Sequence, residues 1–354
     1  MEVYESIIAT KKLIYPNSVY ICTMGELVVE NLEVSYETGN GNVYAVDKVS
    51  FTIPNDTIIG LLGESGCGKS TLSKSIIKDL PSNGNIDSGE VLYAGENIVD
   101  LSKEELQAIR WEEIAYVPQN AMNCLDPVYT IEDQLIETIS AHRDLTKRKK
   151  VEKAKEIFDM VGIDKSRLQD YPHEMSGGMK QRIVLALAFI LDPGLIIADE
   201  PTTGLDVLIR DKILADIEKY QKEFDVSILI VSHDIADLVE TCDHLMVMYG
   251  GKIVEKSSSN QLIQNPTHPY TMGLINSTPR LETDAHDLIS MSMDPPDLQS
   301  PPAGCRFIDK CPFEVPECSN AHPDLTETNG SVSACFRAND SKEIHAHIQN
   351  EGWM

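Results

Sequence analysis

Two stretches that lie close together decide the fold of this chain: Ser176-Gly177-Gly178-Met179-Lys180-Gln181-Arg182 and Leu195-Ile196-Ile197-Ala198-Asp199-Glu200. The first is a glycine turn that opens a helix. The second is a short apolar run that predicts a strand buried in the centre of a parallel sheet. A helix that leads into such a strand predicts an α/β fold.

Two carboxylates, Asp199 and Glu200, stand at the carboxyl end of the predicted strand. Ligands of doubly wound folds bind at this edge of the sheet, so Asp199 is expected to hold Mg²⁺ through water. Glu200 is expected to orient or deprotonate an attacking water, since phosphoryl transfer depends on positioning and charge stabilisation. A solvated strand end is the alternative, and the apolar strand before the pair argues against it.

A phosphate-binding loop lies upstream and fits the pattern GxxxxGK[ST]. Residues 57–62 before it predict a strand, and residues 71–80 after it predict a helix. The glycines let backbone N–H groups turn inward around a polyphosphate, and the helix N-terminus adds partial positive charge. The loop consists of Gly63, Glu64, Ser65, Gly66, Cys67, Gly68, Lys69, Ser70 and Thr71.

Within this loop, Lys69 supplies a mobile cation for the β- and γ-phosphates, and the Ser70 hydroxyl can ligate Mg²⁺. Cys67 is interpreted as a small filler. A glycine turn that binds nothing is the alternative, and the strand, the helix, the lysine and the serine together argue against it.

These features together resemble the ATPases of the ABC family, and the resemblance covers residues 26–255. It implies a P-loop ABC ATPase fold, with a RecA-like core, an antiparallel β subdomain and a helical subdomain. A small Cys-rich C-terminal extension follows here. The resemblance also implies that the ligands are ATP and Mg²⁺.

Single residues match further motifs of the family in the right order. Gln119 matches the Q-loop glutamine, which touches Mg²⁺ and the water, and His233 matches the switch histidine at the γ-phosphate. Tyr36 matches the aromatic residue that stacks on adenine, and Asp206 lies in a stretch that resembles the D-loop. A lone His or Gln is more often structural, but the order and separation of the motifs favour the functional interpretation. An ordinary strand tyrosine is the alternative for Tyr36.

The glycine turn also has a role in the family. Ser176, Gly177 and Gly178, at the start of their helix, correspond to the signature that binds the γ-phosphate of ATP held by a second subunit. Two ATP molecules then join two such chains face to face, so a monomer is expected to bind nucleotide yet hydrolyse it poorly. Met179 replaces the usual Gln, as in one of the two ATPase subunits of peptide importers.

Three features narrow the resemblance to importers of dipeptides, oligopeptides and nickel: the segment 119–131, the segment 265–274 and a four-cysteine extension. The resemblance implies a second, different ATPase subunit, two transmembrane permease subunits and an extracellular solute-binding protein as partners. The chain would then lie on the cytoplasmic face of the cell membrane, attached through the permeases.

Half of the eight cysteines, Cys305, Cys311, Cys318 and Cys335, fall in a Pro-rich segment that is poor in apolar residues. Disulfides are disfavoured, because a nucleotide-binding chain without a signal peptide works in reducing cytosol. Zinc is an alternative, although the tight pair spacing of structural zinc sites is absent. Widely spaced thiols favour a [4Fe–4S] cluster, with which the family extension is associated. Unligated thiols are the remaining alternative.

The net charge is −26, from 30 Lys plus Arg and 56 Asp plus Glu among 354 residues. This acidity argues against nucleic acid as a ligand, because phosphate backbones recruit basic surfaces. A high-salt cytoplasm and an ordinary acidic protein both fit it. The apolar run 183–191 is about half the length of a bilayer span, so membrane contact is expected through partners.

The predicted organisation has four parts. Residues 1–25 form a poorly ordered N-terminal extension, for which Met24 is an alternative start. Residues 26–280 form the ABC ATPase domain, with the helical subdomain at about 101–172. The segment 281–302 is an extended, Pro-containing linker, and residues 303–354 form the four-cysteine extension. Helices are predicted at 147–161, 206–224 and 235–241.

The sequence therefore predicts an ATP-hydrolysing subunit that powers peptide import, and Glu200 and His233 indicate that it is competent in hydrolysis. A nickel or metal-chelate importer is the alternative within the same class. A soluble non-transport ABC ATPase would need two cassettes in one chain or a long coiled-coil insertion, and the sequence has neither.

Overall fold

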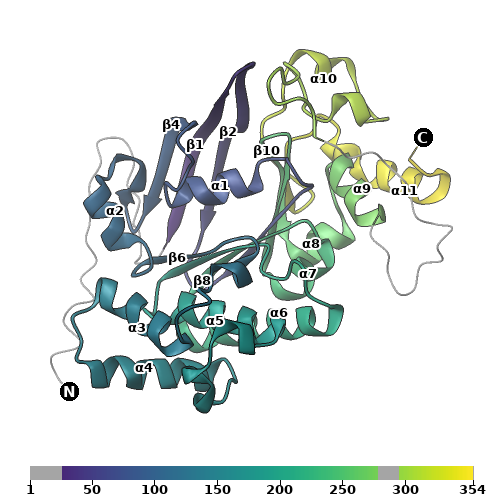
Figure 1. The fold of residues 1–354 in the computed structure, drawn as a ribbon. Helices are drawn as coiled ribbons and strands as arrows, with labels where there is room; N and C mark the ends of the chain where they lie inside the picture. The colour runs from purple at the N-terminus through teal and green to yellow at the C-terminus, as the bar shows by residue number, and fades with distance from the viewer. Residues whose placement is uncertain (1–25, 278–294, 354) are drawn as a thin grey trace, which may run out of the picture.

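The computed structural model describes residues 26–277 and 295–353. Two β-sheets and the helices around them build this part of the chain (Figure 1). The predicted N-terminal extension, residues 1–25, and most of the predicted linker lie outside the described residues.

The smaller sheet is antiparallel, in the order β2-β1-β4-β5. Its strands are β1 (Leu27–Thr38), β2 (Gly41–Ile53), β4 (Gly84–Tyr93) and β5 (Glu96–Asn97). Side chains alternate between the two faces of a strand, and the apolar ones point toward one core. That core includes Leu27, Val29, Leu32 and Phe51. β2 is an edge strand of this sheet, so only one of its two sides pairs with β1.

The main sheet has the order β11-β12-β10-β9-β3-β8-β7-β6. Its strands are β3 (Ile58–Leu62), β6 (Ile114–Val117), β7 (Leu195–Asp199), β8 (Ser227–Ser232), β9 (His244–Tyr249), β10 (Lys252–Ser258), β11 (Thr326–Thr328) and β12 (Ser331–Ser333). The strands from β9 to β6 are parallel, and those from β9 to β11 are antiparallel. The carboxyl ends of β3, β6, β7 and β8 therefore meet at one edge of the sheet.

The helices are α1 (Lys69–Ile76), α2 (Lys103–Ile109), α3 (Ile131–His142), α4 (Lys147–Met160), α5 (Gly177–Phe189), α6 (Val207–Phe224), α7 (Ile235–Thr241), α8 (Ser259–Gln264), α9 (Pro269–Ser277), α10 (Pro316–Asn320) and α11 (Ser341–Glu351). α1 packs against strands of both sheets. In Figure 1, α3 to α6 lie on the lower side and the antiparallel sheet on the upper side, with β6 and β8 between them. The helices predicted at 147–161, 206–224 and 235–241 agree with α4, α6 and α7 to within a residue.

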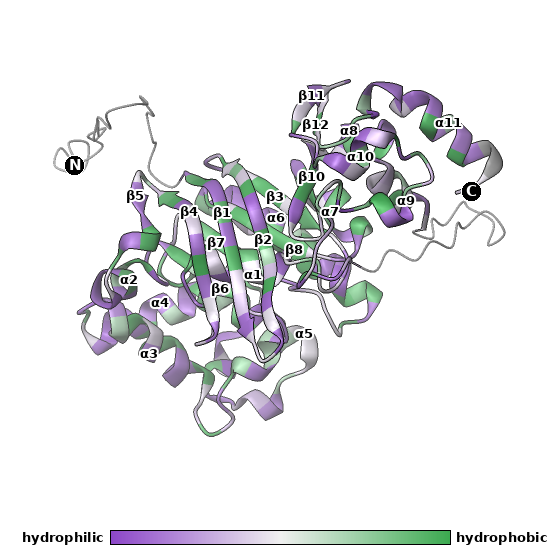
Figure 2. Ribbon diagram, turned by 90° about the horizontal axis from the view of Figure 1, so that it is seen from above, coloured by the Kyte–Doolittle hydropathy of each residue, from purple (hydrophilic) through white to green (hydrophobic). Residues whose placement is uncertain are grey.

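The C-terminal region is built onto the main sheet. β12 pairs with β10, which would otherwise be an exposed edge strand. Phe307 is fully buried and makes ring contacts with Tyr249 and Tyr270 of the ATPase part. Figures 1 and 2 both place α9, α10 and α11 together beside β10. The region is poor in apolar residues because it shares the core of the ATPase part.

Hydrophobic residues follow the strands of both sheets in Figure 2. No helix among residues 26–277 and 295–353 has the length and apolar character of a membrane span.

Candidate nucleotide-binding site

The phosphate-binding loop connects β3 to α1, and its shape depends on glycine. Gly68 has a φ of 111°, and a Cβ there would lie 2.1 Å from the carbonyl oxygen of Ala45. A Cβ at Gly63 would lie 2.4 Å from the carbonyl oxygen of Met248. A side chain at either position would therefore push the loop away from β2 and β9. Cys67 is completely buried beneath the loop.

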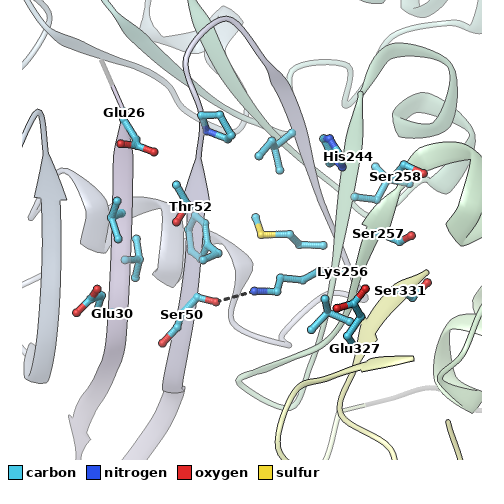
Figure 3. Close-up of a pocket in the computed structure, with 18 of the residues that line it drawn as sticks. Glu26, Glu30, Ser50, Thr52, His244, Lys256, Ser257, Ser258, Glu327 and Ser331 are labelled. Atoms are coloured by element: carbon cyan, nitrogen blue, oxygen red, sulfur yellow. Dashed lines mark hydrogen bonds between the residues drawn. The ribbon is translucent and has the colours of Figure 1, made fainter. Parts of the chain in front are cut away.

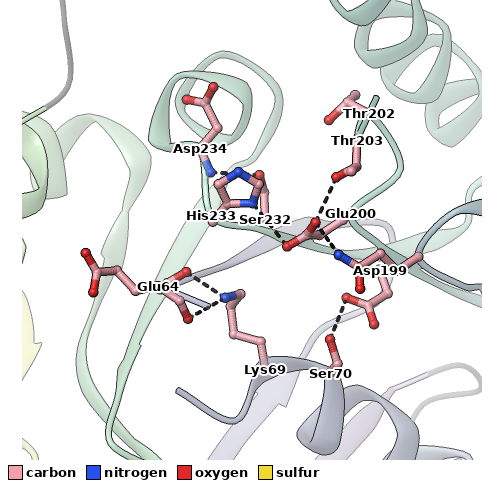
Figure 4. A network of polar contacts seen from close by, with 12 residues as sticks. Glu64, Lys69, Ser70, Asp199, Glu200, Thr202, Thr203, Ser232, His233 and Asp234 are labelled. Carbon is pink, nitrogen blue, oxygen red and sulfur yellow. Dashed lines mark hydrogen bonds and ion pairs between the residues drawn. The ribbon is translucent and has the colours of Figure 1, made fainter. Parts of the chain in front are cut away.

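Lys69 is the cation of this loop. Its Nζ donates to the carbonyl oxygens of Gly63 at 2.6 Å and Glu64 at 2.9 Å (Figure 4). The ammonium thus lies above the backbone of the loop, where the phosphates of a nucleotide would be held. A polyphosphate can replace these carbonyl acceptors with charge-assisted hydrogen bonds.

Asp199 ends β7 and is 1% exposed. Its carboxylate accepts hydrogen bonds from the Ser70 hydroxyl at 3.2 Å and from the Tyr116 hydroxyl at 3.0 Å. Burial raises the pKa of Asp199, and the neighbouring charge of Glu200 adds to the rise. The oxygens of Ser70 and Asp199 are the hard donors that Mg²⁺ prefers, so this pair fits a magnesium–nucleotide ligand.

Glu200 follows Asp199 in a left-handed conformation with a φ of 50°. The Glu200 amide holds that turn by donating to the carbonyl of Val231 at 2.9 Å. A glutamate rarely adopts this conformation, and strain of this kind is found at functional sites. The turn directs the Glu200 side chain toward the ends of β6 and β8.

Three side chains hold the Glu200 carboxylate. Gln119 donates to Oε2 at 2.7 Å, Thr203 donates to the same oxygen at 2.8 Å, and His233 Nδ1 lies 3.0 Å from Oε1. Partial burial acts to raise the pKa of Glu200, but these hydrogen bonds outweigh it, and the pKa lies below its usual value. Figure 4 shows Thr203 and His233 converging on Glu200 from different loops.

A pocket of about 280 Å³ joins these elements. Tyr36 is one of its lining residues, and the Tyr36 hydroxyl donates to the Thr71 hydroxyl at 3.1 Å. The lining residues are Tyr36, Val43, Ala45, Ser65, Gly66, Gly68, Lys69, Ser70, Thr71, Gln119, Glu200 and Leu298. The fold therefore gathers residues from β1, the phosphate-binding loop, the end of β6 and the end of β7 around one space.

The predicted signature residues and Asp206 lie outside this pocket. Ser176 caps α5 by accepting from the amide of Met179, and Ser176 and Gly177 are exposed. Gly178 packs against Ile209 of α6, and Asp206 caps that helix. None of the four lines the pocket of its own chain.

Val43 and Ala45 line the pocket and were not predicted, and three further residues around the site were also missed. Tyr116 is bonded to Asp199, Thr203 is bonded to Glu200, and Leu298 lines the pocket from the C-terminal side of the chain. Tyr116 and Thr203 belong to motifs recognised in the sequence, but a motif does not show which way a hydroxyl points. Nothing in the sequence around Leu298 signals a place beside a nucleotide.

The four C-terminal cysteines line one pocket, together with Phe307 and Phe313. Burial raises the pKa of Cys305 to about 11 and those of Cys311 and Cys335 to about 12. Among the residues that the structure describes, no three His, Cys, Asp or Glu side chains lie close enough to hold a metal ion. As they lie, the four thiols do not form a closed site for any metal.

A second cavity, of about 700 Å³, is larger than the nucleotide pocket and lies between β1–β2 and β9–β10 (Figure 3). Lys256 reaches across it and donates to the carbonyl of Ser50 at 3.3 Å. No predicted site residue lines this cavity. Size alone is therefore a poor guide to the functional site of this chain.

Known proteins resemble this chain over most of its length. The family model described as "ABC transporter" matches residues 46–203, and "Oligopeptide/dipeptide transporter, C-terminal region" matches residues 254–318. The chain is similar to the dipeptide transport ATP-binding protein DppD of Bacillus subtilis, at 38% identity over 92% of this chain and 98% of that protein. It is also similar to the oligopeptide transport ATP-binding protein OppD of Salmonella typhimurium, at 35% identity over 88% and 93% of the two chains.

The fold is similar to that of a solved ATP-binding cassette in a dimeric, post-hydrolysis state with ADP and Pi. The TM-score is 0.58 at 26% identity, over 66% of this chain and 98% of that chain. A dimeric bacterial ABC transporter cassette gives a TM-score of 0.59 at the same identity. The P-loop ABC ATPase fold predicted from the sequence is therefore confirmed. The chain belongs to the ABC transporter family of ATP-binding proteins, in the group that carries the oligopeptide/dipeptide transporter C-terminal region.

Proposed function

We propose that this chain hydrolyses ATP to power the import of peptides through an ABC transporter. The observation that carries the proposal is the Glu200 carboxylate, held ionised by three hydrogen bonds beside a phosphate-binding loop. The peptide substrate class is supported by the match to the oligopeptide/dipeptide C-terminal region and by the names of the relatives.

Each residue of the pocket has a part in this reaction. Lys69 and the loop amides hold the β- and γ-phosphates, and Ser70 and Asp199 hold Mg²⁺, with Gln119 nearby. Bound Mg²⁺ would neutralise charge on the phosphates. Tyr36 supports the adenine ring, since it is the aromatic residue among those that line the pocket.

Glu200 is the proposed general base. Because its pKa is lowered, the carboxylate is ionised at neutral pH and can accept a proton from water. Gln119 and His233 orient the carboxylate, and both are exposed, so a bound γ-phosphate can reach them. Phosphoryl transfer then depends on the position of the water relative to the γ-phosphate.

The chain acts with partners. Ser176, Gly177 and Gly178 do not line the pocket of their own chain, and this supports a composite site in which they contact ATP bound by a second ATPase subunit. We assign Asp206 to the same interface. The further partners are two permease subunits and an extracellular solute-binding protein, which would hold the chain at the cytoplasmic face of the membrane.

We divide the chain into the ATPase domain 26–280, with its permease-docking helical subdomain at about 101–172, the linker 281–302 and the four-cysteine extension 303–354.

The extension is proposed to bind a [4Fe–4S] cluster through Cys305, Cys311, Cys318 and Cys335. A single zinc ion would draw its sulfurs to within about 4 Å of one another. A cluster stands between its thiolates and separates them further, and the support for it is that all four thiols line one pocket; zinc is the alternative.

Reconstitution tests the function. The full transporter, with this chain, its partner ATPase and the permeases, is placed in vesicles with the binding protein, and ATP turnover is measured with added dipeptides, oligopeptides or nickel. We expect peptides to stimulate turnover and to enter the vesicles. Stimulation by nickel alone would contradict the peptide assignment and leave the ATPase role intact.

A further inference from the structure

A short segment from the C-terminal side of the chain completes the nucleotide pocket. We call residues 295–298 the strap. Leu298 lines the pocket together with Tyr36 and Val43. At the other end of the strap, Pro295 faces the phosphate-binding loop. The Cγ of Pro295 would lie 3.6 Å from a Cβ added to Gly66.

Backbone pairing fixes the strap to the antiparallel sheet. The amide of Tyr44 donates to the carbonyl oxygen of Leu298 at 2.9 Å. Tyr44 lies on β2, whose other side pairs with β1, so the strap occupies the open edge of that strand. An edge strand offers free N–H and C=O groups to any segment that lies along it.

Side chains hold the strap from the other side. Pro296 lies against Gly250. A Cβ added to Gly250 would be 3.0 Å from the Cγ of Pro296 and 3.2 Å from the Cβ of Arg306. Arg306 is buried and forms an ion pair with Asp47 of β2, which Lys252 also contacts at 3.1 Å. The strap is thus enclosed between the ATPase part and Arg306, which follows the first of the four C-terminal cysteines.

The chemistry of the strap suits one part of a nucleotide. Lys69, Ser70 and Thr71 make the phosphate end of the pocket polar, whereas Tyr36, Val43 and Leu298 are the larger apolar and aromatic groups that line it. The purine base is the flat, weakly polar part of ATP, and it gains most from apolar contact. Leu298 is only partly buried, so a base can cover it further.

We propose that Leu298 is a base-binding residue of the ATP site, supplied by the segment that leads into the four-cysteine region. This deepens the proposed function and rests on it, because it concerns the same pocket. It makes nucleotide affinity depend on residues that lie beyond the ATPase fold.

Binding measurements on the full-length chain test the proposal with two probes, ATP with Mg²⁺ and inorganic tripolyphosphate with Mg²⁺. Leu298→Ala is expected to raise the Kd for ATP about fivefold, from the loss of part of a leucine contact, and to leave the Kd for tripolyphosphate unchanged. Leu298→Met should restore most of the ATP affinity, because it returns apolar surface. Leu208→Ala, at an exposed leucine on α6, is the matched control.

The outcomes separate the two claims. Equal weakening of ATP and tripolyphosphate would mean that the strap only supports the loop, and unchanged ATP binding would mean that Leu298 does not touch the base. Either result overturns the proposal. Lys69→Ala tests the proposed function separately, because it should weaken both probes; if it does not, the pocket itself is wrongly assigned.

Discussion

Asp199 and Glu200 are adjacent in the chain, yet the fold gives their carboxyl groups opposite environments. Asp199 is buried at the end of a central strand, and its pKa is raised. Glu200 turns out of the strand into a set of hydrogen-bond donors, and its pKa is lowered. The proposed roles, metal ligand for Asp199 and general base for Glu200, rest on position: Asp199 lies beside the Ser70 hydroxyl, and Glu200 lies beside Gln119 and His233.

The role of Glu200 leads to a prediction about turnover. Glu200→Gln keeps the shape of the side chain but removes the proton acceptor, so ATP hydrolysis by the assembled transporter should fall about a hundredfold or more. Binding of ATP and Mg²⁺ should be preserved. The measurement is phosphate release by a transporter in which the ATP site of the partner ATPase is disabled. Glu152→Gln, on the exposed face of α4, is the control. Near-normal turnover in the Glu200 variant would exclude it as the base.

At the scale of elements, the corner between β10 and α9 is built around buried polar groups. Glu255 is 0% exposed and accepts from the amide and hydroxyl of Thr267 and from the amide of His268. His268 Nδ1 accepts from the amide of Tyr270 at 3.0 Å, so that nitrogen carries no proton. The corner directs Tyr270 into the aromatic cluster with Phe307 and so joins the C-terminal region to the ATPase part.

This corner predicts a dependence of stability on pH. Burial, with repulsion from His322, lowers the pKa of His268 to about 3, against 6.5 for an unperturbed histidine. As the pH falls from 6.5 toward 3, the unfolded chain binds a proton at this position and the folded chain does not. The free energy of unfolding should therefore fall, by up to about 1.4 kcal/mol per pH unit from this group.

Urea unfolding curves at several pH values check this dependence. His268→Gln should give a smaller loss of stability between pH 6.5 and pH 4.5 than the unmodified chain. His173→Gln, at an exposed histidine, should leave the loss unchanged. Identical pH profiles for the chain and its His268 variant would contradict the assigned protonation state.

The N-terminus of α5 gives a second prediction at this scale. Ser176→Arg places a bulky cation where the partner's γ-phosphate is proposed to bind, while this chain's own pocket is unchanged. Nucleotide binding by this chain should persist, and hydrolysis should be abolished at the partner's phosphate-binding loop. Trapping of ATP resolved by site decides between the two loops, with Ser82→Arg, at an exposed serine outside the helical subdomain, as the control. Loss of turnover only at this chain's own loop would contradict the composite site.

Across the whole molecule, the C-terminal region is an addition to the ATPase sheet. It extends that sheet through β12, shares its aromatic core through Phe307, and pairs Arg306 with Asp47 of β2. α11 packs on α9 through Ile344, Ile348 and Met272. The region that carries the cysteine pocket therefore packs against both sheets.

The cysteine pocket carries the last prediction. Protein purified without oxygen should contain about four iron and four sulfide per chain. If the proposed cluster is present, each Cys→Ser change at Cys305, Cys311, Cys318 or Cys335 should remove its brown chromophore. The C-terminal region should also become more sensitive to protease, because ligation would support its folding. Cys124→Ser, at an exposed cysteine outside the group, should change neither. Stoichiometric zinc without sulfide, from cells grown with ample iron, would contradict the cluster.

Local patterns in the sequence were sufficient for the fold class, the phosphate-binding loop and the strand that ends in Asp199 and Glu200. These features depend on neighbouring residues: glycines allow the turn, and a short apolar run that ends in two carboxylates favours a buried strand. The placement of Gln119 and His233 beside Glu200 was inferred from motif order, and their hydrogen bonds are visible only in the structure.

Tertiary structure alone decided the rest. The pairing of β12 with β10, the burial of Phe307 among Tyr249 and Tyr270, and the position of Leu298 at the nucleotide pocket join residues that are many tens of positions apart. No local pattern encodes such contacts, because they depend on which edges and apolar faces remain open after the sheets have formed. The opposite pKa shifts of Asp199 and Glu200 have the same origin, since burial and hydrogen-bond partners exist only in the folded chain.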